Sequence, residues 1–355
     1  MSPSSTIRVG VIGTGFGSLV QIPGFQRSPG VEVVAVASGR EARAGEVAEQ
    51  FGLAEAYGDY RQMLAEQELD LVSIVTPPYL HHEMALAVAE RRRHVLCEKP
   101  FALNLGQARE MLAAAERAGV VHGVDHEFRY LPARARMKEL IDEGYLGEVR
   151  LIRVTALTPM LLDPGGRPWS WWSEREKGGG LLGAWGSHLI DTLSWFFGPI
   201  VDVAAQVDTF VPRRPLPDGS EWREVAADDQ VAVLFRLANG ASATYLISGL
   251  GHPSQDRLEA YGSEGTLIIE GAELFGARGG AKLEPIGLQP GPELRPGDDG
   301  RISPFLSFLE RFLPQVRGEA GGDVATFRDG VYVQAVMDAI HQSADEGRFV
   351  KVEET

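Results

Sequence analysis

Short hydrophobic runs alternate with amphipathic segments along the first third of the chain. The runs are rich in Val, Ile and Leu and are bounded by turn residues, which is typical of buried parallel strands. The segments between them carry apolar residues every three to four positions, as helices packed on a sheet do. This order predicts a doubly wound parallel sheet with strands at Ile7–Ile12, Val31–Ala37, Leu71–Val75, His94–Leu96 and Val120–Val124. Helices are expected between them at Ala42–Phe51, Asp59–Gln67, His82–Arg92 and Leu103–Ala118.

The pattern changes after about residue 123. Turn signals at Ala238-Asn239-Gly240 and Ser263-Glu264-Gly265 connect longer strand patterns, which predicts a mostly antiparallel sheet. The expected strands are Glu148–Leu157, Gln230–Leu237, Ala241–Ile247, Leu258–Gly262 and Thr266–Glu270, and the expected helices are Pro132–Glu143, Pro304–Arg317 and Thr326–Gly347. The stretches 211–220 and 289–300 are rich in Pro and Gly and are expected to be surface loops.

The fold class that follows is α/β, with two domains. A doubly wound parallel sheet is expected over residues 1–122 and an α+β domain over residues 123–355. The sequence leaves open whether the last two helices pack within this second domain or back on the first.

Composition and charge exclude several classes of protein. The 355 residues include 49 acidic and 34 basic side chains, a formal net charge of −15, which disfavours a general surface for nucleic acid or anionic membranes. The single cysteine, Cys97, excludes an intrachain disulfide and a multi-cysteine metal site, and it fits a reducing compartment. No apolar run approaches the ~20 residues that a membrane helix needs. We therefore expect a cytoplasmic protein without a metal site.

The first motif with chemical meaning is VGVIGTGFGS at residues 9–18. Gly13 and Gly15 occupy the first two positions of the dinucleotide fingerprint, directly after an apolar strand, and Ser18 occupies the third. A tight glycine turn there lets backbone N–H groups approach a pyrophosphate. We therefore predict a dinucleotide site on a Rossmann domain, with Gly13, Gly15 and Phe16 in contact with the cofactor.

The end of the second strand indicates which dinucleotide is preferred. An acidic residue at this position would bind the ribose 2′-hydroxyl and repel a 2′-phosphate, but the segment reads Val36-Ala37-Ser38-Gly39-Arg40, with the first carboxylate at Glu41. Ser38 can donate a hydrogen bond and Arg40 can bind phosphate oxygens. The sequence therefore predicts NADP(H) as the preferred cofactor, with NAD(H) as the second choice.

Two further motifs follow the fourth and fifth strands of the predicted sheet, at the edge where doubly wound sheets bind ligands. They are TPPYLH at residues 76–81 and CEKP at residues 97–100. Thr76, Pro77, His81 and Glu98 are accordingly expected to contact the cofactor. Lys99 can exchange a proton with a reacting hydroxyl, although its position alone is also compatible with a surface lysine.

These motifs together carry a family resemblance. The chain resembles the Gfo/Idh/MocA oxidoreductases, the group of glucose-fructose oxidoreductase and inositol dehydrogenase, over nearly its whole length. The resemblance rests on the fingerprint, on TPPYLH, above all on HVLCEKPF before a helix, and further on Arg129-Tyr130-Leu131-Pro132, GGG…GSHLID, Asp228-Asp229-Gln230 and YGSEGT. It implies a Rossmann domain, a C-terminal domain whose open sheet forms a homodimer or homotetramer, and hydride transfer between nicotinamide and sugars, cyclitols or related compounds. Lys99 then matches the catalytic lysine.

The family's second motif is incomplete in this chain. Its three glycines match Gly178–Gly180 and its histidine matches His188, but the aspartate between them is replaced by Ala184. A carboxylate beside an imidazole raises its basicity, so its loss weakens a histidine general base. Asp191, one helical turn after His188, is a candidate substitute, and a capping or surface carboxylate is the alternative. His188 itself is either a substrate contact and proton carrier or a buried structural histidine.

An aromatic cluster precedes the glycines. Trp169, Trp171 and Trp172, with Trp185, offer indole faces that stack on the C–H faces of a pyranose, or they fill a domain or oligomer interface. His126 and its neighbours Asp125 and Glu127 stand where relatives often carry a basic residue, which makes them candidates for binding hydroxyls or an amino group. The expected substrate contacts are therefore His126, Trp169, Trp172, Trp185, His188 and Asp191.

The sequence thus predicts an enzyme that oxidises a hydroxyl of a sugar-like substrate reversibly, with Lys99 and His188 handling the proton. Two alternatives remain. Ala184 favours a non-catalytic sensor that binds dinucleotide and sugar and controls a partner. A nicotinamide-assisted lyase or glycosidase would oxidise its substrate transiently and regenerate the cofactor.

Overall fold

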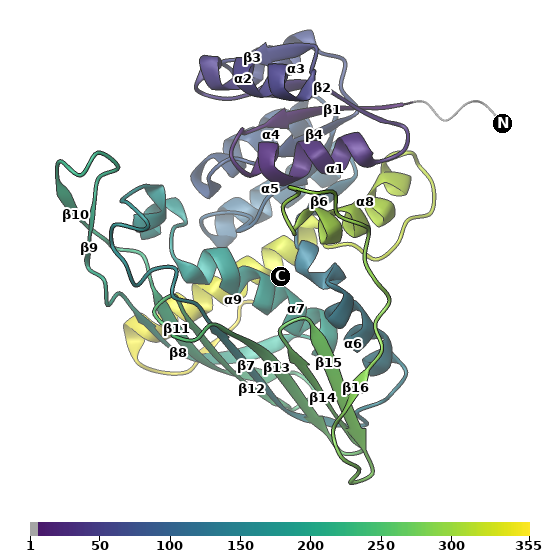
Figure 1. The fold of residues 1–355 in the computed structure, drawn as a ribbon, viewed down its shortest axis with the longest axis vertical. Coiled ribbons are helices and arrows are strands. Elements are labelled where there is room, and N and C mark those ends of the chain that lie inside the picture. Colours follow the sequence, from purple (N-terminus) through teal and green to yellow (C-terminus); the bar gives the residue numbers. More distant parts are fainter. Residues whose placement is uncertain (1–5) are drawn as a thin grey trace. The chain divides into compact units, whose positions relative to one another are not determined.

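The computed structural model describes residues 6–355, which form two compact units (Figure 1). The first contains the chain up to Tyr130 together with Gly291–Val331, and the second contains Leu131–Pro290 and Tyr332–Thr355. The chain therefore passes from the second unit to the first within the stretch 289–300, for which the sequence predicted only a surface loop.

The first unit is built on a six-stranded parallel sheet in the order β3-β2-β1-β4-β5-β6, as predicted for a Rossmann domain. Its strands are β1 (Ile7–Ile12), β2 (Val31–Ala37), β3 (Glu55–Tyr57), β4 (Leu71–Ile74), β5 (His94–Cys97) and β6 (His122–Val124). Only β3 was not predicted, because its three residues carry no run of apolar positions. The carboxyl ends of β1, β2, β4 and β5 place the predicted cofactor residues along one edge of this sheet.

Helices cover the first sheet and complete its core. They are α1 (Ile22–Arg27), α2 (Glu41–Phe51), α3 (Tyr60–Glu66), α4 (His81–Glu90), α5 (Leu105–Ala118) and α8 (Ile302–Val316), with short helices η1 (Gly17–Gln21), η2 (Pro78–Leu80) and η3 (Glu127–Tyr130). Helix α8 comes from far along the chain and contributes Phe305, Phe308 and Phe312, all fully buried, to the core around β1. Their rings stack with centroids 6.1 Å and 5.2 Å apart.

The second unit is built on a nine-stranded sheet in the order β16-β15-β14-β13-β7-β12-β11-β8-β17. Only β7 and β12 pair in parallel, so the sheet is mostly antiparallel, as predicted. Its strands are β7 (Val149–Leu157), β8 (Ile200–Asp208), β11 (Gln230–Leu237), β12 (Ser242–Ser248), β13 (Gln255–Gly262), β14 (Gly265–Glu270), β15 (Glu273–Arg278), β16 (Glu284–Ile286) and β17 (Val350–Lys351). A separate hairpin of β9 (Arg213–Pro215) and β10 (Trp222–Glu224) lies partly in the expected loop 211–220.

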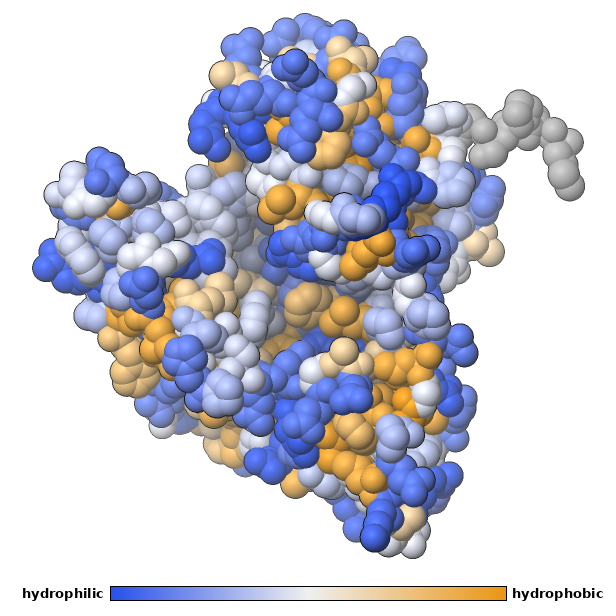
Figure 2. Space-filling model, in the orientation of Figure 1, coloured by the Kyte–Doolittle hydropathy of each residue, from blue (hydrophilic) through white to orange (hydrophobic). Residues whose placement is uncertain are grey.

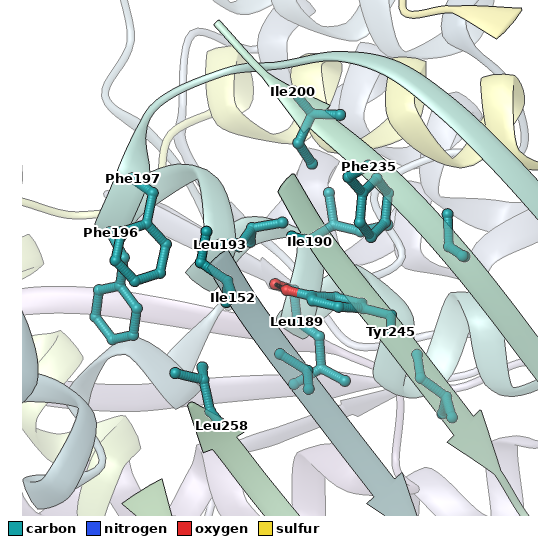
Figure 3. Packing of buried hydrophobic residues seen from close by; sticks show 14 of the residues in the cluster. Ile152, Leu189, Ile190, Leu193, Phe196, Phe197, Ile200, Phe235, Tyr245 and Leu258 are labelled. Carbon is teal, nitrogen blue, oxygen red and sulfur yellow. Dashed lines mark hydrogen bonds between the residues drawn. The ribbon is translucent and has the colours of Figure 1, made fainter. Parts of the chain in front are cut away.

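One face of the second sheet is packed by helices. These are α6 (Pro132–Asp142), α7 (Ser187–Phe197) and the part of α9 (Phe327–Glu346) that belongs to this unit, and the short helices are η4 (Trp171–Ser173), η5 (Arg175–Lys177) and η6 (Leu182–Gly186). Figure 3 shows Leu193 and Leu189 of α7 beside Ile152 and Tyr245 of the strands, with Phe196 and Phe197 at the end of α7 in the same cluster.

The other face of the second sheet is open. Leu151, Leu234 and Leu246, on the adjacent strands β7, β11 and β12, are each 39–40% exposed, and both strand neighbours of Leu234 and Leu246 are buried. Hydrophobic residues also gather on the surface over β14–β16 (Figure 2). None of the helices in residues 6–355 combines the length and the apolar character that a membrane crossing needs.

Candidate active site

The glycine loop after β1 has the backbone that a dinucleotide requires. Gly13 has φ +119°, and a Cβ atom on it would lie 2.3 Å from the Val75 carbonyl oxygen, so only glycine fits. A Cβ on Gly15 would meet nothing within 4 Å, so the loop is open to an approaching ligand on that side. The loop leads into a π-turn, η1, and the guanidinium carbon of Arg301 lies 4.7 Å from the Phe16 ring centre. The loop thus fits a pyrophosphate held by backbone N–H groups.

The end of β2 places Ser38 and Arg40 beside this loop. Thr14 Oγ1 donates to Ser38 Oγ at 3.4 Å, and the Arg40 backbone N–H donates to the same Ser38 oxygen at 3.3 Å. Ser38 is half-buried and the Arg40 side chain is exposed. The hydrogen bond between Thr14 and Ser38 therefore joins the two segments that the sequence assigns to pyrophosphate and adenosine ribose.

His81 joins the loops after β4 and β5. Its ring is fully buried, with Nε2 at 2.8 Å from the Thr76 carbonyl oxygen and Nδ1 at 3.1 Å from that of Pro100. Burial lowers the pKa of His81, with hydrogen bonds to these carbonyls opposing. The ring thus holds the Thr76-Pro77 loop against the segment that follows Lys99. Thr76 Oγ1 also contacts Met84 Sδ at 3.4 Å. We therefore propose that His81 shapes the cofactor site through these loops.

Lys99 follows β5 and stands beside a cluster of buried acids. Glu98, Asp125 and Glu127 are 6%, 0% and 2% exposed, and Lys99 is half-buried. The Lys99 backbone N–H donates to Glu98 Oε2 at 3.2 Å. Gln21 Nε2, at the end of η1, donates to Glu98 Oε1 at 2.7 Å and to Asp125 Oδ2 at 3.0 Å.

Burial dominates the acidity of this carboxyl cluster, which we define as Glu98, Asp125 and Glu127. It raises the pKa of Glu127 to about 8, with the Glu98 charge adding and the Lys99 ammonium opposing. It also raises the pKa of Asp125 well above its usual range, to which the charges of Glu127 and Glu98 add. Burial raises the pKa of Glu98 as well, again opposed first by Lys99. Burial therefore favours the protonated form of all three carboxyl groups, and the Lys99 ammonium opposes this effect at Glu98 and Glu127.

In the second unit, the triple glycine is explained by close backbone contacts. A Cβ on Gly179 would lie 2.4 Å from the Trp172 carbonyl oxygen. Gly180 has φ +99°, and its Cβ would lie 2.1 Å from Asp228 Oδ1. Asp228 Oδ2 accepts the Leu182 N–H at 2.8 Å at the start of η6, and burial raises the pKa of Asp228 to about 6. Gly179 and Gly180 therefore let the chain pass Trp172 and Asp228 closely before α7 begins.

The π-turn η6 contains Ala184 and leads directly into α7, which carries His188 and Asp191. Both side chains are only 1% exposed. Burial raises the pKa of Tyr245 well above its usual range. The charge of Arg134 lowers this pKa, and the charge of Asp191 raises it. Asp191 is thus buried near a tyrosine and an arginine of its own unit, and its role as a substrate contact stays a prediction.

The aromatic residues predicted to contact the substrate differ in how much of each side chain is already in contact with other protein groups. Trp169 Nε1 donates to the Glu224 carbonyl oxygen at 2.9 Å, which fixes it on the β9–β10 hairpin. One face of Trp172 is covered by the Arg167 guanidinium, whose carbon lies 3.6 Å from the ring. Trp185 is half-buried against the core. His126, in the first unit, is 1% exposed and its backbone N–H donates to the Val124 carbonyl oxygen.

Sequence reasoning missed Gln21 and Ser73, because neither belongs to a motif. The Ser73 hydroxyl, on β4, hydrogen-bonds Gln21 Oε1 and so fixes the amide that holds Glu98 and Asp125. Within residues 6–355, no group of three or more His, Cys, Asp or Glu side chains is arranged to bind a metal ion.

Comparison with known proteins agrees with this geometry. A family described as oxidoreductases with an NAD-binding Rossmann fold matches residues 7–126, and the GFO/IDH/MocA C-terminal domain matches residues 135–268. An uncharacterised oxidoreductase of Synechocystis sp. is 34% identical over 99% of this chain and 98% of its own length. The chain belongs to the Gfo/Idh/MocA oxidoreductase family.

Within this family, levoglucosan dehydrogenase of Pseudarthrobacter phenanthrenivorans is 30% identical over 87% of this chain and 86% of its own length. The structure of a levoglucosan dehydrogenase in complex with NADH and levoglucosan matches with a TM-score of 0.89 and 28% identity, over 98% of this chain and all of that one. A second complex, with NADH and L-sorbose, also has a TM-score of 0.89, at 27% identity, and covers 99% of this chain and 100% of its own. The Gfo/Idh/MocA chain described here is thus an oxidoreductase with an NAD-binding Rossmann domain.

Proposed function

We propose that this protein transfers a hydride between NADP(H) and a hydroxyl or keto carbon of a sugar, a polyol or a related compound. The observation that carries the proposal is the position of Lys99. It follows β5 at the sheet edge that also carries the open glycine loop, and its ammonium acts on the buried carboxyl cluster.

When bound, the nicotinamide accepts the hydride from the carbinol carbon or returns it. Lys99 takes the hydroxyl proton during oxidation, stabilises the developing oxyanion, and donates the proton in the reductive direction. His188 assists as a second proton carrier or by binding the hydroxyl. The backbone of Gly13–Gly15 holds the pyrophosphate, with Phe16 beside it, and the Thr76-Pro77 loop and Glu98 complete the cofactor site.

We propose NADP(H) as the preferred cofactor because the segment after β2 offers a hydroxyl and a guanidinium and no carboxylate before Glu41. Ser38 is held by Thr14, and the exposed Arg40 side chain is available to a 2′-phosphate. The levoglucosan dehydrogenase structures are complexes with NADH, so the two cofactors must be compared directly in this chain.

A sugar-like substrate is supported by two observations. The relatives named above are described with levoglucosan and L-sorbose, and the tryptophans of the second unit offer apolar faces of the kind that bind pyranose rings. His126, Trp169, Trp172, Trp185, His188 and Asp191 remain the proposed contacts. Trp185 is the favoured stacking residue, since Trp169 is fixed by its hairpin and one face of Trp172 is covered.

A non-catalytic sensor remains the second candidate, because Ala184 replaces the carboxylate that would support His188. One assay separates the two functions. Purified protein is mixed with NADP+ or NAD+ and a panel of sugars and polyols that includes levoglucosan and L-sorbose, and the absorbance of the reduced nicotinamide is followed. The enzyme predicts an increase with at least one compound. Cofactor binding without any absorbance change across the panel would favour the sensor.

A further inference from the structure

A buried chain of polar groups connects the glycine loop to Lys99 within the first unit. The Ser73 hydroxyl fixes the Gln21 amide, whose nitrogen donates to Glu98 at 2.7 Å and to Asp125 at 3.0 Å. Glu98 in turn accepts the Lys99 backbone N–H at 3.2 Å. Gln21 ends the π-turn that begins after Phe16, so one side chain ties the end of the dinucleotide loop to the catalytic segment.

The two carboxyl groups that accept hydrogen bonds from Gln21 cannot both be ionised without an electrostatic cost. Both accept from the same amide nitrogen, at 2.7 Å and 3.0 Å, so the two acids lie close together, and a proton on one of them removes the repulsion between two buried charges. Glu98 is 6% exposed and Asp125 is 0% exposed, so water does not screen them.

The other charged or titratable groups around the pair do not supply enough positive charge for three ionised acids. The facing groups are the Lys99 ammonium, the Arg301 guanidinium, the Glu127 carboxyl and the buried Cys97 thiol. Arg301 already pairs with Asp299 at 2.7 Å. A pair that carries one proton and one negative charge therefore balances Lys99 best.

The geometry points to Gln21, Glu98 and Asp125 as positioning residues for Lys99. The Gln21 amide holds Glu98 and Asp125 as a carboxyl pair that shares one proton, and this singly charged pair fixes the Lys99 backbone and supplies one counter-charge to its ammonium. This inference rests on the proposed function, which assigns the proton transfer to Lys99. A second negative charge beside the ammonium would hold its proton more tightly and slow its release to the reacting oxygen.

The shared proton is tested without any substrate by infrared spectroscopy of protonated carboxyl groups at pH 7.5. Glu127→Gln is used as the background, because Glu127 is itself protonated near this pH. The background protein should keep a protonated-carboxyl band, and adding Asp125→Asn or Glu98→Gln should remove it. Glu49→Gln, on the exposed face of α2, is the matched control and should change nothing. A band that persists in both double variants, or that is missing from the background, would overturn the inference.

The positioning role is tested by kinetics with Gln21→Met, which removes the hydrogen bonds of the amide with Glu98, Asp125 and Ser73 and keeps the side-chain length. We expect kcat to fall about tenfold or more, because hydrogen bonds to charged groups are lost, while KM and the Kd for NADP+ change less than about threefold. The pH profile of kcat should shift as well, which a loss of packing alone would not cause. An unshifted pH profile would contradict the positioning role.

Absence of turnover in the unmodified protein would contradict the proposed function alone, since the infrared measurement still decides whether the proton is shared.

Discussion

Glu127 should make the stability of the protein depend on pH. Its pKa is raised from 4.5 to about 8, so the folded protein holds its proton more tightly than the unfolded chain. Its contribution to stability is therefore complete below about pH 4.5 and is lost as the pH rises through about 8. Glu127→Gln mimics the protonated form and should remove this decline.

The free energy of unfolding of the wild-type protein should fall by roughly 3–5 kcal/mol between pH 5 and pH 9 because of Glu127. It is measured as the free energy of unfolding in urea at several pH values, with the exposed Glu49→Gln as the control. Parallel pH curves for the wild-type protein and Glu127→Gln would show that Glu127 is not protonated in the folded state.

Arg40 should determine the choice of cofactor. Arg40→Ala removes the guanidinium expected to bind the 2′-phosphate, and the Kd for NADP+ should rise about tenfold or more while the Kd for NAD+ changes less than about twofold. Arg43→Ala removes a neighbouring arginine that pairs with Glu46 and serves as the control. Isothermal titration calorimetry with each cofactor gives both constants. Tighter binding of NADH than NADPH by the wild-type protein would contradict the proposed preference.

Some residues of the site could be predicted and others could not, for a physical reason. Gly13, Gly15 and Lys99 could be proposed as site residues because a pyrophosphate site and a proton transfer would restrict the residue type at a fixed distance from a strand. Gln21 and Ser73 form their contact across η1 and β4, which are brought together only by the folded sheet. No local pattern marks such a contact.

At the scale of elements, strands with a continuous apolar run or a clear alternation were predicted well. Strands β1, β2 and β11 have the predicted bounds. Strand β8 was missed because only two of its nine residues are fully buried, which leaves a weak period of two. Strand β15 pairs on both sides but contains Gly276, which weakens the strand signal.

The turn before α7 depends on Gly180. Gly180→Ala should lower the free energy of unfolding by about 3 kcal/mol or more, because the new Cβ would be strained at φ +99° and would collide with Asp228. Gly119→Ala is the control, since Gly119 also has a positive φ, +67°, but lies in the ordinary left-handed region and its Cβ would meet nothing within 4 Å. It should cost only about 1 kcal/mol. Equal losses in the two variants, measured by urea unfolding, would show that the contact with Asp228 does not matter.

At the scale of the whole molecule, the open face of the second sheet supports the proposed homodimer or homotetramer. Leu151, Leu234 and Leu246 expose apolar side chains on three adjacent strands. Leu234 and Leu246 are diagonal neighbours on β11 and β12, and Leu151 on β7 lies opposite Ser242. Leu246→Arg should convert the assembly to monomers in analytical ultracentrifugation. Leu19→Arg, at an exposed leucine of the first unit, should leave the assembly intact. A wild-type protein that sediments as a monomer at micromolar concentration would contradict the assembly.

The central claim is that Lys99 carries the proton transfer of a nicotinamide-dependent oxidoreductase. The most direct test compares wild-type protein and Lys99→Met, with a substrate found in the sugar panel, by reduced-nicotinamide absorbance and by the Kd for NADP+. The account predicts turnover in the wild-type protein and a loss in kcat of about 10²–10⁴-fold in the variant, with the Kd for NADP+ changed less than about threefold. Undiminished turnover in Lys99→Met, or no turnover by the wild-type protein with either cofactor, would contradict it.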